Sequence, residues 1–265
     1  MMQEPEGPEE LAPLKPVKPV GPVASLPPPP PPEPDPFWSY GDLLIFAGLT
    51  LPCMVLGFGV VKAAFWMLNL HPAVETWELL ADQFAFYALL SGVLVALFRV
   101  QYDRPFWRSL GWVTPRLPLF SIVTSGVGFA MAVMLLSALI RTPQIESPLT
   151  KLLKDPTSLV LVAIFGSVVA PVCEELLFRG FLQPLLVRSL GAVAGIVATA
   201  LPFGMLHFYE YGKSWRHVLL ISISGAAFGW MRHATGSTKA AAGMHSSYNA
   251  FQFVLLVMAK GLPHG

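Results

Sequence analysis

The sequence predicts an all-α polytopic membrane protein: a bundle of about seven transmembrane helices, in a range of about six to eight, preceded by a disordered proline-rich tail. Two observations predict this class. Of the 265 residues, 54% are hydrophobic and only 12% are charged, whereas a soluble domain carries about 25% charged residues. Apolar runs long enough to cross a bilayer also recur along the chain. The net charge of +1 gives no reason to expect a nucleic-acid partner.

The beginning of the chain is rich in proline, with an unbroken run from Pro27 to Pro32. Proline has a fixed φ and no amide donor, so such a run favours polyproline II over a packed core. We therefore predict a disordered tail over residues 1–36 and a membrane domain over residues 37–265. A docking strip for a polyproline-binding domain is the alternative to a plain spacer.

Seven apolar runs follow the tail, and each predicts a membrane helix. Phe37, Trp38 and Tyr40 precede the first run, as expected where a chain enters the membrane interface. The fifth and sixth runs are shorter than the roughly 20 residues of a full span. The runs cover approximately residues 42–61, 79–98, 117–140, 158–187, 190–205, 218–230 and 240–258.

Three charged residues, Glu174, Glu175 and Arg179, lie inside the fourth run. A charge near the centre of a bilayer costs roughly 2.5–3.5 kcal/mol on insertion scales, so charges kept there indicate a function. On a helix, Glu175 and Arg179 are four residues apart and can pair, while Glu174 points about 100° away from Glu175. We therefore expect Arg179 to hold Glu175 and Glu174 to stay free for chemistry. Pro171, one turn earlier, predicts a kink beside these residues.

Two further pairs of residues, each with at least one polar member, lie near the end of the fifth run and in the seventh. They are Phe203 with His207, and His245 with Asn249. The members of each pair are four residues apart and share a helix face. An unsatisfied polar group in hydrocarbon costs several kcal/mol, so we expect these side chains and the glutamates to converge inside the bundle. Taken alone, either histidine would be an ordinary interfacial residue, and Asn249 a bridge between two helices.

The patterns Glu-Glu-x-x-x-Arg, Phe-x-x-x-His and His-x-x-x-Asn, in this order on successive helices, resemble the motifs of the CPBP family. That family is the CAAX protease and bacteriocin-processing group of intramembrane proteases, also called the ABI family, and it includes the Ras-converting CAAX endoprotease. The resemblance covers roughly residues 150–260, which become the expected catalytic core. It implies a helical membrane bundle with a polar cavity in which a peptide bond is cleaved.

The resemblance also implies roles for the motif residues. Glu174 and His207 would activate a water molecule, and His245 and Asn249 would stabilise the oxyanion. The supporting residues would be Glu175, Arg179 and Phe203. The implied substrate is a peptide or protein. Since the family includes cleavage of prenylated C-terminal CAAX tails as well as other peptide processing, a lipidated or membrane-associated substrate is one of the options that stay open here. The implied location is a multi-pass protein of the cell membrane, plasma or inner.

Metal dependence stays open at this point, because the family has been described both as metalloproteases and as metal-independent glutamate enzymes. Glu174, His207 and His245 could supply three ligands to a zinc ion with an open fourth position. The chain has no His-Glu-x-x-His pattern, which favours a metal-free mechanism and disfavours a site-2-type metalloprotease.

Two alternatives come from other classes of protein. The chain could be a non-catalytic membrane protein, such as a self-immunity or scaffold partner, or a proton-coupled transporter that uses the polar cluster as a relay. The complete set of three motifs argues against a decayed site. A proton relay has no evident need for the His-x-x-x-Asn spacing.

Overall fold

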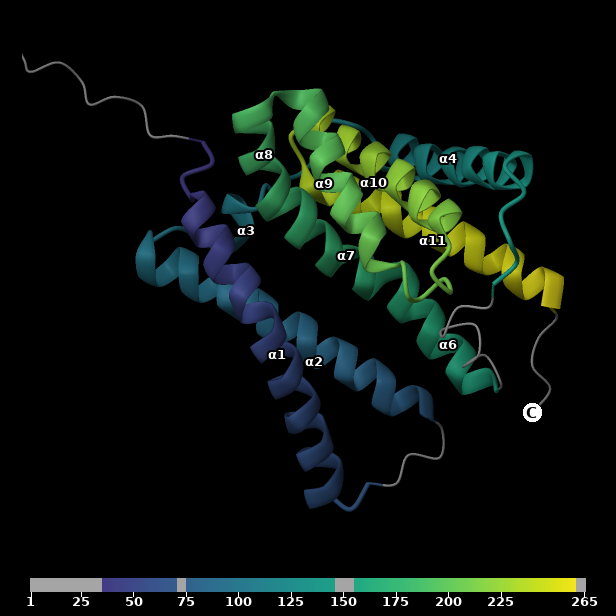
Figure 1. Ribbon diagram of the computed structural model, residues 1–265, viewed down its shortest axis with the longest axis horizontal. Helices are drawn as coiled ribbons and strands as arrows, with labels where there is room; N and C mark the ends of the chain where they lie inside the picture. Colours follow the sequence, from purple (N-terminus) through teal and green to yellow (C-terminus); the bar gives the residue numbers. More distant parts are fainter. Residues whose placement is uncertain (1–34, 71–74, 146–154, 261–265) are drawn as a thin grey trace, which may run out of the picture. The chain divides into compact units, whose positions relative to one another are not determined.

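The computed structural model describes residues 35–70, 75–145 and 155–260 (Figure 1). The chain divides into two units, Met1–Glu33 and Pro34–Gly265, and every described residue lies in the second. The predicted proline-rich tail, residues 1–36, therefore lies outside the described residues except at its last two positions. All regular secondary structure of the described residues is helical, which confirms the predicted fold class.

The first part of this unit contains three long helical segments and one short helix. A capping box sets the start of the first helix, which begins at Tyr40. In it the side chain of Ser39 accepts from the amide of Asp42, and Asp42 Oδ2 accepts from the amide of Ser39 at 2.7 Å. The first two helices pack against each other. The elements are α1 (Tyr40–Met67), α2 (Glu75–Ala96) with its π-helical extension η1 (Leu97–Gln101), α3 (Phe106–Ser109) and α4 (Leu119–Leu139).

The fourth apolar run forms one helical path of 35 residues, Pro156–Leu190. Asp155 caps its start, because Oδ1 accepts from the amide of Ser158 at 2.9 Å, and Pro156 occupies the first turn, where its missing amide costs nothing. In Figure 1 the α-helical parts follow one another in green. The segments are α6 (Pro156–Ile164), η2 (Phe165–Val169), α7 (Ala170–Glu175), η3 (Leu176–Leu182) and α8 (Gln183–Leu190).

At the position of the predicted kink, the helix widens into the π-helical turn η2. The amide of Ala170 donates to the carbonyl of Phe165, five residues earlier. The next amide in this pattern would belong to Pro171 and would reach the carbonyl of Gly166. Since proline has no amide hydrogen, the carbonyl of Gly166 is left for another donor.

The last part of the chain forms α9 (Ala192–Leu206), α10 (Trp215–Thr235) and α11 (Thr238–Lys260). α9 packs on α8 and α10, and α11 packs on α4 and α10. Glycine allows close approach at these contacts: a Cβ at Gly195 would lie 2.6 Å from the backbone of Val187, and one at Gly204 would lie 2.7 Å from the carbonyl oxygen of Val218. All seven predicted apolar runs are thus helical.

Four of the described helical segments are long and apolar enough to cross a membrane: Tyr40–Met67, Thr76–Gln101, Leu119–Leu139 and Pro156–Leu190. α9 is apolar but has only 15 residues, so the number of seven spans stays a prediction. Leu44 and Val55 of α1 are 73% and 63% exposed. Such exposed apolar surface is expected where a helix faces lipid.

Candidate active site

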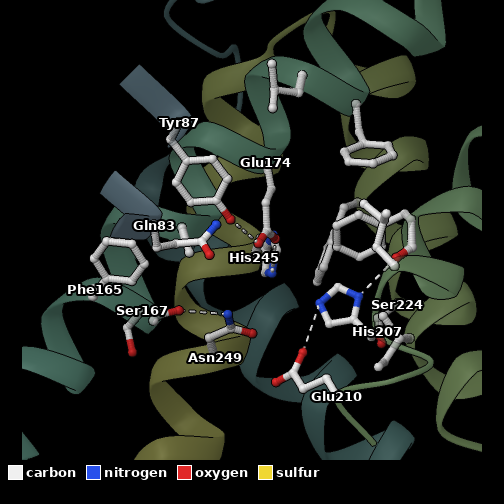
Figure 2. A pocket seen from close by; sticks show the side chains of 18 of the residues that line it. Gln83, Tyr87, Phe165, Ser167, Glu174, His207, Glu210, Ser224, His245 and Asn249 are labelled. Carbon is white, nitrogen blue, oxygen red and sulfur yellow. Dashed lines mark hydrogen bonds and ion pairs between the residues drawn. The ribbon is translucent and has the colours of Figure 1, made fainter. Parts of the chain in front are cut away.

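A cavity of about 780 Å³ is lined by residues from α1, α2, the long helix Pro156–Leu190 and the helices α9, α10 and α11. Its volume falls within the roughly 300–1,000 Å³ of small-ligand sites. The structure brings polar residues of all three sequence motifs to its wall (Figure 2). They are Glu174, His207, His245 and Asn249.

Behind this wall, Glu175 and Arg179 form an ion pair whose side chains are both 0% exposed. Arg179 Nη1 lies 2.9 Å from Glu175 Oε1, so the predicted pairing is observed. Arg179 Nη2 donates to the carbonyl of Gly225 in α10 at 2.7 Å, and the guanidinium lies 4.4 Å from the ring centroid of Phe203 in α9. We call Glu175, Arg179, Phe203 and Gly225 the ion-pair cluster.

Gly225 is the residue that lets α10 approach this ion pair. A Cβ at this position would lie 2.9 Å from Phe203 Cδ1 and 3.0 Å from Arg179 Nη2. Any side chain would therefore push the ring or the guanidinium away, and with it the partner of Glu175.

His245 of α11 connects the two neighbouring glutamates. Its Nδ1 lies 2.9 Å from Glu175 Oε1 and its Nε2 lies 3.9 Å from Glu174 Oε2, while the ring stacks on Phe228 with centroids 4.4 Å apart. The carboxylate on Nδ1 fixes the orientation of the ring and leaves Nε2 facing the cavity. A separation of 3.9 Å is one that a single water molecule bonded to both atoms can bridge.

Glu174 occupies a different environment from Glu175. Its side chain is 19% exposed, and its Oε1 accepts a hydrogen bond of 2.9 Å from the phenol of Tyr87 in α2. Figure 2 shows Tyr87 and Glu174 side by side above His245. We call the polar side chains that face the cavity around Glu174 the cavity cluster: Tyr87, Glu174, His207, Glu210 and Asn249.

His207 caps the end of α9. Its Nδ1 lies 3.0 Å from the carbonyl oxygen of Phe203, and its Nε2 lies 3.9 Å from Oε2 of Glu210, towards which it points in Figure 2. His207 therefore faces Glu210, although His207 and Glu174 line the same cavity. Burial raises the pKa of the Glu210 carboxyl, His207 opposes the rise and the charge of Glu174 adds to it.

Asn249 is held by the backbone feature that Pro171 creates. Its Nδ2 donates to the carbonyl of Gly166 at 2.8 Å, the carbonyl left without an amide donor in η2. A carbonyl accepts only from the NH₂ end of an amide, so this contact decides which way the Asn249 side chain faces. One of its two hydrogens stays available to the cavity.

The proposed metal ligands Glu174, His207 and His245 do not form a ligand set in this arrangement. In residues 35–70, 75–145 and 155–260, no three side chains of His, Cys, Asp or Glu gather closely enough to hold a metal ion. His207 faces Glu210, whereas His245 faces the two glutamates. The described residues thus do not fit a three-ligand metal centre.

Sequence reasoning missed two residues of the cavity cluster. Glu210 follows His207 by three residues, a spacing that would have suggested a pair if the helix had been expected to continue. Tyr87 has no comparable signal, because it precedes Glu174 by 87 residues in the chain. Only the packing of α2 brings its phenol to the site.

The helical fold and the polar cavity define a class of protein: a helical membrane protein with a polar cavity between its helices. Residues 156–251 match the family model described as Type II CAAX prenyl endopeptidase Rce1-like. This match confirms, for this segment, the resemblance to the CAAX protease, or CPBP, family found in the motifs. α1, α2 and α4 lie outside the matched residues. Comparisons with curated proteins and with solved structures gave no match.

Proposed function

We propose that the protein is an intramembrane endopeptidase of the CAAX type, which hydrolyses a peptide bond of a membrane-associated substrate. One observation carries the proposal. Glu174 Oε2 and His245 Nε2 face the cavity 3.9 Å apart, inside the segment that matches the endopeptidase family. The buried ion pair behind them holds His245 in place through Glu175.

In the proposed reaction, Glu174 is the general base. Its Oε2 takes a proton from a water molecule while the water oxygen attacks the carbonyl carbon of the substrate. His207, which lines the same cavity with its Nε2 directed towards Glu210, assists this step. The C–N bond breaks when the tetrahedral intermediate collapses. The leaving nitrogen then receives the proton that Glu174 had taken up, so the enzyme returns to its starting state.

The oxyanion of the intermediate would be stabilised by His245 and Asn249. Asn249 contributes the amide hydrogen that Gly166 does not use. His245, with a hydrogen on each ring nitrogen, donates from Nε2 to the oxyanion while its Nδ1 donates to Glu175 Oε1. Both donors are fixed before the substrate binds, and such preorganisation makes a hydrogen bond effective in a transition state.

The substrate is proposed to carry a lipid. Apolar side chains of α1 and α2, including Leu43, Phe46 and Leu80, line the cavity together with the polar cluster. An apolar wall beside a reactive polar centre suits a peptide with an attached hydrocarbon chain. The family description, which refers to prenyl endopeptidases, supports the same substrate class.

The test is cleavage of a fluorogenic CAAX-type peptide by the purified protein in detergent. The peptide is prepared with and without a farnesyl thioether on its cysteine, and Glu174→Gln serves as the inactive control. We expect the wild type to cleave the farnesylated peptide and the variant to leave it intact. A folded wild type that cleaves neither peptide would contradict the CAAX-type activity and favour the scaffold or transport alternatives.

Chelation tests the mechanism separately. Since no step in the proposed reaction passes through a metal ion, we expect cleavage to continue after incubation with 1,10-phenanthroline and removal of the chelator. Loss of activity that returns on addition of zinc would show that the wild type uses a metal ion.

A further inference from the structure

Tyr87 is a buried tyrosine whose phenol reaches the reactive carboxylate from outside the matched segment. It lies in α2, is 8% exposed, and donates to Glu174 Oε1 at 2.9 Å. Its ring stacks on Phe165 of η2, with centroids 6.4 Å apart and planes 14° apart. A buried, stacked ring that also donates a hydrogen bond has little freedom to turn elsewhere.

A buried contact near the start of α2 fixes the position of Tyr87 along the long helix. Thr76 Oγ1 lies 2.8 Å from Ser158 Oγ, and because Ser158 already donates to Asp155, Thr76 is the donor of this bond. Thr76 and Tyr87 are eleven residues apart, about three helical turns, so they lie on the same face of α2. The hydrogen bonds of Thr76 with Ser158 and of Tyr87 with Glu174 together set the register of α2 against the long helix.

The consequence concerns the two oxygens of Glu174. Oε1 is occupied by the phenol of Tyr87, whereas Oε2 is left to face His245 and the cavity. A carboxylate without such a donor turns freely about its terminal torsion, because that torsion has broad and shallow minima. The phenol therefore selects the oxygen that is presented to the cavity.

We propose that Tyr87 is a positioning residue for the hydrolysis, which holds Glu174 Oε1 so that Oε2 meets the attacking water. The inference rests on the proposed function and adds to it a helix that the family match does not include. Its chemical role is orientation, because its phenol bonds the proposed base. A misplaced base loses rate without losing substrate affinity.

Tyr102 provides a matched control. Its phenol also donates to a carboxylate, Asp42 Oδ2, at 2.5 Å, but it does not line the cavity. Tyr87→Phe and Tyr102→Phe therefore remove the same group from the same kind of bond. A purely structural role for Tyr87 would make the two variants behave alike.

Kinetics form the first part of the experiment. With the farnesylated peptide, we expect Tyr87→Phe to lower kcat by roughly 10- to 100-fold while KM stays within about twofold of the wild type. Tyr102→Phe should keep both constants of the wild type. An unchanged kcat in Tyr87→Phe would overturn the positioning role.

Infrared spectroscopy forms the second part and needs no substrate. The carboxylate band of Glu174 is identified from the difference between the wild type and Glu174→Gln. We expect this band to shift in Tyr87→Phe and to stay in place in Tyr102→Phe. If Tyr87→Phe does not fold, Tyr87→3-fluorotyrosine preserves the shape and changes the strength of the donor, so the band should again move.

The two parts separate the possible failures. A band that does not move overturns the hydrogen bond between Tyr87 and Glu174, and the inference with it. A folded wild type that cleaves neither peptide overturns the proposed function, and with it the catalytic role of Tyr87. The band then still decides whether the phenol holds the carboxylate.

Discussion

Glu174 and Glu175 follow one another in α7, yet the ion-pair cluster and the cavity cluster give them opposite surroundings. Glu175 is fully buried, and its Oε1 lies 2.9 Å from both Arg179 Nη1 and His245 Nδ1. Glu174 is partly exposed to the cavity and has one oxygen bonded to Tyr87. A step of one residue turns a side chain by about 100° around the helix. That rotation separates the two carboxylates.

The difference shows how one helix can carry a fully buried carboxylate and a cavity-facing carboxylate side by side. A buried charge must have a close partner, so Glu175 is committed to Arg179 and His245. Glu174 retains Oε2 for a reactant, because only Oε1 has a hydrogen-bond donor among the described contacts. His245 belongs to both environments, so the ion-pair cluster also orients the residue that faces Glu174.

The largest expected effect comes from replacing each of the two glutamates by glutamine in separate variants. Glu174→Gln should lower kcat by about 10²- to 10⁴-fold, because it removes the proposed general base, and should leave the thermal unfolding temperature close to that of the wild type. Glu175→Gln should lower the unfolding temperature, because Arg179 loses its buried counter-charge. Peptide cleavage and thermal unfolding in the same detergent measure both. Equal losses in the two variants would remove the distinction between the clusters.

Arg179→Met tests the ion-pair cluster from its other side. We expect the free energy of unfolding to fall by roughly 3–5 kcal/mol, because Glu175 would remain buried without a counter-charge. Titration with a denaturing detergent measures this loss. Arg188→Met is the control, since Arg188 is exposed and its guanidinium donates to a backbone carbonyl, that of Pro36. The double variant Arg179→Met with Glu175→Gln should recover part of the loss, and a fully additive loss would contradict the pairing.

Gly225→Ala tests whether close backbone approach maintains the ion-pair cluster. The added methyl group would displace Phe203 or Arg179, so we expect a loss of about 1–3 kcal/mol in the free energy of unfolding, as for other overpacked interiors. Gly48→Ala in α1 is the matched control, because a Cβ at Gly48 meets nothing within 4 Å. Similar stability of the two variants would show that α10 can move away from the guanidinium at little cost.

The smallest expected effect concerns the pH dependence of the cavity cluster. Burial raises the pKa of Glu210 above its ordinary value of 4.5, so the folded state keeps a proton that the unfolded state releases. Stability is therefore lost as pH rises through the interval between the two pKa values. Glu210→Gln does not titrate, so its unfolding temperature relative to that of the wild type should increase from about pH 4 to about pH 7. A difference that stays constant with pH would contradict the raised pKa.

Much of the fold followed from the sequence because it depends on short-range patterns. The apolar runs predicted helices at all seven positions, and the i, i+4 spacing of Glu175 and Arg179 predicted their pairing. The π-helical turn beside Pro171 appeared where a kink was expected, since the missing amide hydrogen acts within one turn. The same turn left a carbonyl for Asn249, a contact that spans 83 residues and has no local signal.

The sequence by itself determined the helices, the face that each motif residue occupies and the separation of the two glutamates, because the geometry of one helix fixes all three. Only the tertiary structure decided the partners. It paired His207 with Glu210, placed His245 between the two glutamates and brought Tyr87 of α2 to Glu174. The physical reason is that contacts between helices depend on how each helix is rotated and shifted against its neighbours. Packing of the whole bundle sets that arrangement, and the spacing of residues within one segment does not encode it.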